Sequence, residues 1–227
     1  MKKNNGINVP LTFKFLFQQN MTTIEKSILD NSMAYAEYVS IAEGLVKSGH
    51  TSTTGFTNSP KILEYAADNI ARMKRLDATI ELTAETLEKL SKITKPIVLL
   101  DITEGWCGDA SQVCPVLEKI AQAQPLITHR VIFRDEHFDI IDAFLTDGGR
   151  SIPKIVALDA DGNVLGSWGP RPQALQDIVQ ANKKAMEQMP KEAQKAQFEI
   201  VKALVHNWYD ADKTVETQRE LIDFLLS

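Results

Sequence analysis

The most constraining feature of this sequence is a change of hydrophobic period near residue 96. Upstream, apolar residues recur at roughly helical spacing, but "PIVLLDIT" (96–103) is an almost continuous apolar run. Such a run is typical of a strand buried on both faces, where both alternating sets of side chains are apolar. Residues from about 107 to 124 return to helical spacing. The sequence therefore predicts a buried strand that leads directly into a helix.

The segments that follow extend this unit into a sheet. Strands are predicted at 127–134, 152–159 and 163–168, the last two joined by the hairpin signal "ADG", with helices at about 138–145 and 173–189. Together with a helix after Thr83, residues 80–190 follow the order α-β-α-β-α-β-β-α. This order predicts an α/β fold with three α/β/α layers around a central mixed sheet.

The remaining residues read as additions to this domain. We expect a disordered arm at 1–20, a helical N-terminal extension at 21–79, the α/β domain at 80–190 and a C-terminal helical extension at 191–227. Within 21–79, one helix is predicted over about Thr23–Lys47 and another after Ser59 and Pro60. The apolar run of the arm is interrupted by Lys14 and is followed by no cleavage site of small residues, so a cytoplasmic location is expected.

Composition excludes several classes of function. The net charge of -5 argues against nucleic acid as a partner, because phosphate binding requires clustered Lys and Arg. No segment approaches the roughly 18 apolar residues that cross a membrane. The 2 cysteines are too few for a disulfide framework, and no Cys/His cluster indicates zinc. We therefore expect no cofactor, no metal and no membrane partner.

The candidate reactive residues lie where the strand at 96–103 leads into the next helix. Cys107 lies at or near the first helical position, where backbone N–H groups and the helix dipole stabilise a thiolate. The location is expected to be partly exposed, and Trp106 offers a flat apolar surface beside the thiol. The carboxylate of Asp109, in the first turn, interacts favourably with the helix dipole. It would raise the pKa of Cys107 if it lies close to the thiol. The alternative is that Cys107 is an inert core thiol.

Cys114 is a different kind of cysteine. It lies seven residues after Cys107, which on a helix corresponds to a rise of about 10.5 Å. A disulfide requires Cα atoms within about 7 Å, so the pair cannot close unless the helix unwinds. Its neighbours Val113, Pro115 and Val116 are apolar, and we expect Cys114 to be a core thiol.

The order of these residues resembles the thioredoxin family. In that family a buried strand that carries an Asp runs into W-C-x-x-C, and a proline kinks the helix; here Asp101 and Pro115 stand six residues before and eight after Cys107. "RSIPK" is similar to the family's cis-proline loop, with Pro153 facing the active cysteine, and "SWGPRP" to the glycine-containing loop around Gly169. The resemblance covers about 80–190 and is to a bacterial thioredoxin-like branch with helical extensions.

This resemblance implies a thiol–disulfide oxidoreductase that departs from the family at one position. Ala110 occupies the place of the resolving cysteine, so a mixed disulfide on Cys107 would need an external thiol to release it. Asp101 then loses its family role of exchanging a proton with the resolving thiol, and its partner is expected to be Lys154, Arg134 or water. The implied site comprises catalytic and substrate-binding residues: Cys107 and Asp101, with Trp106, Ile152, Pro153, Trp168 and Gly169.

Three functions remain open. The first is the monothiol oxidoreductase, whose partners would be protein or low-molecular-weight disulfides and thiols. The second is a non-catalytic module that binds a peptide or a partner chain in the same groove. The third is peroxidase-like chemistry with a Cys107 sulfenate, although no Thr or Arg is arranged to bind peroxide. The pattern predicts neither the physiological substrate nor the oligomeric state.

Overall fold

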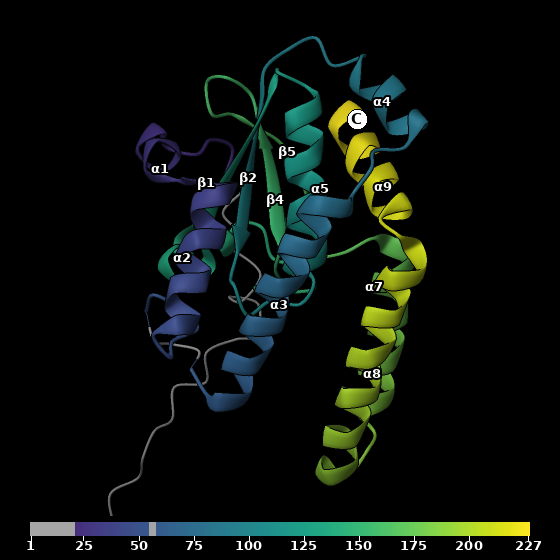
Figure 1. Cartoon of the computed structure of the whole chain (residues 1–227). Coiled ribbons are helices and arrows are strands. Elements are labelled where there is room, and N and C mark those ends of the chain that lie inside the picture. The colour runs from purple at the N-terminus through teal and green to yellow at the C-terminus, as the bar shows by residue number, and fades with distance from the viewer. Residues whose placement is uncertain (1–20, 55–57) are drawn as a thin grey trace, which may run out of the picture.

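The protein is built on a sheet of five strands, as counted over the part of the chain that the structure describes. The computed structural model describes residues 21–54 and 58–227. The strand order is β1-β3-β2-β4-β5 (Figure 1), and β2 and β3 are parallel while the other neighbours are antiparallel. The predicted mixed sheet is therefore confirmed. The strands are β1 (Met33–Ala34), β2 (Ile97–Thr103), β3 (Ile127–Phe133), β4 (Lys154–Leu158) and β5 (Val164–Trp168).

Helices surround this sheet. They are α1 (Lys26–Asn31), α2 (Tyr35–Lys47), α3 (Pro60–Thr79), α4 (Ala84–Leu90), α5 (Ala110–Ala123), α6 (Phe138–Ile141), α7 (Gln173–Met186), α8 (Lys191–Asp212) and α9 (Val215–Leu226). The predicted start of α3 is confirmed, because the Ser59 side chain accepts a hydrogen bond from the backbone N–H of Ile62 and Pro60 opens the helix. No helix of the described ranges is long and apolar enough to span a membrane.

Two buried clusters lie on opposite faces of the sheet. Leu100 and Val156 belong to a cluster with residues of α2, α3 and α6, whereas Leu99 and Ile155 belong to one with residues of α4, α5 and α9. Neighbouring residues of a strand point to opposite faces, so this division places helices on both sides of the sheet. The predicted α/β/α layering is confirmed.

The N-terminal region differs from the single helix expected over Thr23–Lys47. The helix is interrupted between α1 and α2, where Met33 and Ala34 form β1 and pair with Val131 and Arg130 of β3. A strand of 2 residues is too short to show an alternating pattern, which is why the sequence did not reveal it. The segment expected as a helical extension therefore supplies an edge strand of the sheet. The predicted arm at 1–20 lies outside the described residues.

The C-terminal helices leave the sheet and return to it. Figure 1 shows α7 and α8 side by side as a hairpin that projects away from the sheet, and α9 coming back beside α5. The reversal between α8 and α9 uses left-handed backbone at Lys213 and Thr214, with φ of 49° and 69°. Leu221 and Ile222 of α9 are buried in the core shared with α5. The C-terminal region is therefore part of the packed structure.

Candidate functional site around Cys107

Cys107 lies in the turn between β2 and α5. The helix begins at Ala110, three residues later than the sequence pattern indicated. The backbone N–H of Ala110 points at the Cys107 Sγ, 3.5 Å away, and the thiol donates to the carbonyl oxygen of Ile152 at 3.2 Å. Cys107 is only 7 % exposed, so the expected partial exposure was wrong. The thiol is enclosed between the start of α5 and the loop that precedes β4.

Burial dominates the acidity of this thiol. Loss of hydration raises the pKa of Cys107 to about 12, and the carboxylate of Asp109 adds to the rise, as the sequence indicated for a nearby Asp109. The backbone N–H groups of Ala110 and Asp109 and the charge of Arg171 act in the opposite direction. The helix start therefore stabilises the thiolate as expected, but by less than burial destabilises it.

Asp109, two residues after Cys107, is the centre of a network of charged and polar side chains. Its two carboxylate oxygens accept hydrogen bonds from Arg171 at 3.1 and 2.5 Å, and its Oδ1 also accepts one from the hydroxyl of Tyr209 at 2.9 Å. Tyr209 belongs to α8, and Arg171 precedes α7. The network thus ties the C-terminal helices to the turn that carries Cys107.

The loop before β4 meets the site as expected from the sequence. The peptide bond between Ile152 and Pro153 is cis, and the Ile152 carbonyl is the acceptor of the Cys107 thiol. Gly169 adopts φ +117°, and a side chain there would overlap the carbonyl oxygen of Pro153. Only glycine fits this close approach. Ile152 therefore contacts Cys107, and Gly169 packs against the neighbouring Pro153.

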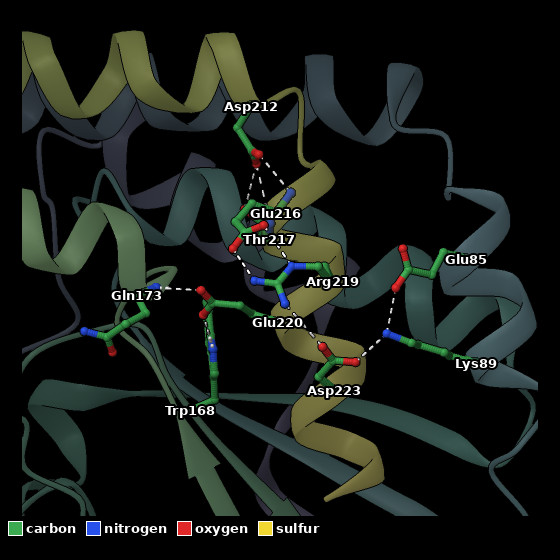
Figure 2. Close-up of polar contacts among 10 residues, drawn as sticks. All are labelled: Glu85, Lys89, Trp168, Gln173, Asp212, Glu216, Thr217, Arg219, Glu220 and Asp223. Atoms are coloured by element: carbon green, nitrogen blue, oxygen red, sulfur yellow. Dashed lines mark hydrogen bonds and ion pairs between the residues drawn. The ribbon is translucent and has the colours of Figure 1, made fainter.

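The two predicted tryptophans have separate environments. Trp106 lies beside Cys107, with the guanidinium of Arg134 4.9 Å from the centre of its ring. Trp168 packs in the core shared with α9, and its indole N–H donates to Glu220 at 3.2 Å (Figure 2). Glu220 also accepts a hydrogen bond from the backbone N–H of Gln173 at 2.7 Å. Trp168 therefore connects β5 to α9, and this placement gives no support to a substrate contact.

Asp101 has a different partner from those expected. Its carboxylate lies 3.5 Å from Nε2 of His129, whose Nδ1 is 3.1 Å from Glu118, which is partly exposed. Lys154 instead binds Thr146 and the carbonyl of Gly169. Burial lowers the pKa of His129, but the two carboxylates outweigh it and leave the pKa above its usual value. Asp101 is therefore one end of a buried Asp–His–Glu chain.

The charge of Asp101 acts on the second cysteine, Cys114. Burial raises the pKa of Cys114 well above its usual value, and the neighbouring carboxylate of Asp101 adds to the rise. Cys114 is fully buried, which confirms the prediction of a core thiol. Both cysteines are free thiols. Asp101 remains a predicted catalytic residue, and its contacts connect it to the second cysteine.

A cavity of about 330 Å³ opens beside Cys107. Its walls come from α3, α7 and α8 and from the turn at 106–109. Asn69 of α3 donates to the carbonyl of Gly105, and Arg72 of the same helix donates to the hydroxyl of Ser111 in α5. These contacts fix α3 against the turn that carries Cys107. The helices outside the predicted 80–190 domain therefore form much of the site.

Sequence reasoning missed the residues that these helices contribute. Phe198, Val201 and Val205 of α8 all line the cavity, and their helical spacing was the available signal. Glu104, just before the turn, was also missed; it is fully buried, and burial raises the pKa of its carboxyl to about 8. One of its oxygens accepts a hydrogen bond from the backbone N–H of Asp135 at 2.9 Å. Nothing in the sequence pattern marked Glu104 as buried.

Known proteins are similar to this chain in sequence and in fold. The family model described as thioredoxin matches residues 55–203, which takes in α3 and part of α8. A putative thioredoxin 2 from Streptomyces coelicolor is 30% identical over 118 residues, which are 51% of this chain and 85% of that protein. A Pseudomonas aeruginosa protein of unknown function has the same fold, with a TM-score of 0.55 and 19% identity over 89% of this chain and 97% of that one.

The chain belongs to the thioredoxin family. The extent of the family match and the coverage of the Streptomyces coelicolor relative establish this membership. The Pseudomonas aeruginosa structure adds that the fold continues over the helices on both sides of the predicted domain.

Proposed function

We propose that this protein is a thiol–disulfide oxidoreductase that works with one nucleophilic cysteine, Cys107. The observation that carries the proposal is the position of its sulfur. Cys107 lines the cavity and contacts the Ile152 carbonyl, whereas Cys114 is fully buried. Membership in the thioredoxin family supports the same class of reaction.

The reaction would proceed in two exchanges. Cys107 loses its proton to water, and its sulfur attacks one sulfur of a disulfide substrate. A new S–S bond forms to Cys107 while the original S–S bond breaks, and the other half leaves as a thiolate with the bonding electron pair. Ala110 supplies no second thiol, so an external thiolate attacks the sulfur of the bound half. It forms a disulfide with that half, and Cys107 leaves as a thiolate. We also propose a cytoplasmic location, where thiols are kept reduced.

The test compares the two cysteines. Wild type, Cys107→Ser and Cys114→Ala are assayed for reduction of bis(2-hydroxyethyl) disulfide with glutathione as the external thiol. We expect turnover in wild type and in Cys114→Ala, and none above the uncatalysed rate in Cys107→Ser. Equal rates in wild type and Cys107→Ser would contradict the proposal.

A second candidate is a non-catalytic binding module in which the same surface holds a peptide or a partner chain. The observation that favours it is the burial of Cys107, with a pKa of about 12. Such a thiol is almost entirely protonated at neutral pH, and the thiol form is a poor nucleophile. Alkylation by iodoacetamide distinguishes the two. A Cys107 that reacts more slowly than a free peptide thiol, without disulfide turnover, would support the binding module.

A further inference from the structure

The cavity beside Cys107 lies between two contacts that join α3 to α8. Lys61 and Glu199 form an ion pair at one end, and Arg75 approaches Asp210 to 4.0 Å at the other. The residues of α3 that line the cavity, 62–72, lie between these two contacts. This cavity, called the chamber below, has a volume of about 330 Å³, which falls within the range of small-molecule sites.

One part of the chamber is apolar. Ile62 of α3, Val179 of α7 and three residues of α8, Phe198, Val201 and Val205, form this surface. Phe198 remains 55% exposed although it lines the chamber. An apolar ligand body seated there would remove this aromatic surface from water, which is favourable.

The other part of the chamber carries two cations, Arg72 and Lys202. Arg72 donates only to neutral groups, the Asn69 side chain at 2.8 Å and the Ser111 hydroxyl at 3.0 Å. The ammonium of Lys202 lies over the ring of Tyr65. Within the described residues, neither Arg72 nor Lys202 forms an ion pair. A partly buried cation in this state attracts an anion that reaches it.

The full charge count of the chamber favours an anion. Its acids are Asp109, which is paired with Arg171, and Asp68, which faces Arg72. Outside the lining, Glu199 acts on Lys202 and Asp210 acts on Arg72, but these carboxylates are paired with Lys61 and Arg75. The lining itself leaves Arg72 and Lys202 against the single charge of Asp68, a net positive balance.

Two residues of the lining, Trp106 and His206, each carry a buried ring nitrogen. Trp106 Nε1 and His206 Nδ1 have no hydrogen-bond partner among the described residues. An unpaired buried polar atom carries a desolvation cost that a polar ligand group would relieve.

We infer that the chamber binds a low-molecular-weight disulfide or thiol that has an apolar body and a carboxylate. The body lies on Val179, Phe198 and Val201, the carboxylate on Arg72 and Lys202, and the sulfur next to Cys107. This inference rests on the proposed function, because it names the substrate class of the same site. The exchange step is unchanged: Cys107 becomes bonded to one half of the substrate, and the other half leaves as a thiolate.

The test uses two aromatic disulfides that differ in charge. 5,5′-Dithiobis(2-nitrobenzoate) carries one carboxylate on each half, whereas 4,4′-dithiodipyridine is neutral at pH 8, and both release a product that can be followed by its absorbance. Second-order rate constants with each probe are measured for wild type, Arg72→Gln, Lys202→Gln and the double variant. Lys195→Gln is the matched control, since Lys195 lies on α8 and is exposed outside the chamber. Mass spectrometry identifies Cys107 as the labelled residue.

We expect the double variant to react with the anionic probe about tenfold more slowly than wild type, a factor that corresponds to roughly 1.4 kcal/mol. The ratio of the anionic-probe rate to the neutral-probe rate should fall by the same factor, because a general effect of losing the Arg72 contacts would slow both probes equally. Lys195→Gln should match wild type with both probes. Equal slowing with both probes, or none with either, would overturn the substrate class and leave the exchange function intact. Failure of both probes to label wild-type Cys107 would overturn the exchange function itself, and the substrate class with it.

Discussion

The charge of Asp109 is expected to restrain the reactivity of Cys107. Burial and then Asp109 are the two largest causes that raise the pKa of this thiol to about 12. Replacing Asp109 with Asn removes the negative charge and also frees the positive charge of Arg171, which acts in the opposite direction. Both changes favour the thiolate, so the pKa of Cys107 should fall.

The size of the effect follows from typical charge interactions. A single nearby charge shifts a pKa by about 1 to 3 units, and we take a fall of about 1 to 2 units for the Asp109→Asn variant. The thiolate fraction at pH 8 then rises about 10- to 100-fold. A less basic thiolate is also less nucleophilic, with a Brønsted slope of about 0.4 to 0.5, so the net gain in rate is roughly 3- to 15-fold.

The assay is alkylation by iodoacetamide between pH 7 and 10, with the modified cysteine identified by mass spectrometry. The rate should rise with pH in wild type, because the thiolate forms only as the pH approaches the pKa. The whole profile should move to lower pH in Asp109→Asn. Arg171→Gln should move it to higher pH, since the charge of Asp109 then loses its counterion. Asp139→Asn, an exposed change outside the site, is the control.

An Asp109→Asn profile that coincides with wild type would refute this reasoning. It would mean that burial alone sets the pKa of Cys107 and that the network with Arg171 and Tyr209 is only structural. Thermal unfolding of each variant separates this result from a loss of folding.

Three further outcomes are expected. Ala110→Cys restores a C-x-x-C pair with Cys107, and the variant should reduce insulin disulfides with dithiothreitol faster than wild type; an unchanged rate would show that burial prevents the pair from acting. His129→Leu leaves Asp101 buried without its cation, which should cost about 3 to 5 kcal/mol and lower the Tm by roughly 6 to 20 °C. Because the pKa of His129 is raised in the folded state, its stabilising contribution is full below about pH 6.5 and is lost as the pH rises through the folded pKa. The free energies of unfolding measured with urea should therefore differ less between variant and wild type at pH 9 than at pH 6. Gly169→Ala places a Cβ against a backbone carbonyl of the loop before β4, and circular dichroism should show a lower Tm than for Gly44→Ala, where the space is open.

Local patterns in the sequence predicted most of the fold. The strand at 96–103, the proline-interrupted helix after it and the capped start of α3 each depend on neighbouring residues, and each is confirmed. The short strand β1 was missed because its existence depends on pairing with β3, which lies almost a hundred residues away. Lys154 and Arg134 were wrong as predicted partners of Asp101 for the same reason, since His129 on another strand lies 3.5 Å from its carboxylate.

The sequence by itself determined the family, the mixed sheet and the position of one cysteine at a strand-to-helix turn. These follow from hydrophobic period and from the short-range preferences of Cys, Pro and Gly in fixed places. Only the tertiary structure decided how acidic Cys107 is and what surrounds it. Its burial, its contact with Ile152, and the walls that α3 and α8 place beside it come from segments far apart in the chain. Desolvation and charge depend on distances in space, which the order of residues does not specify.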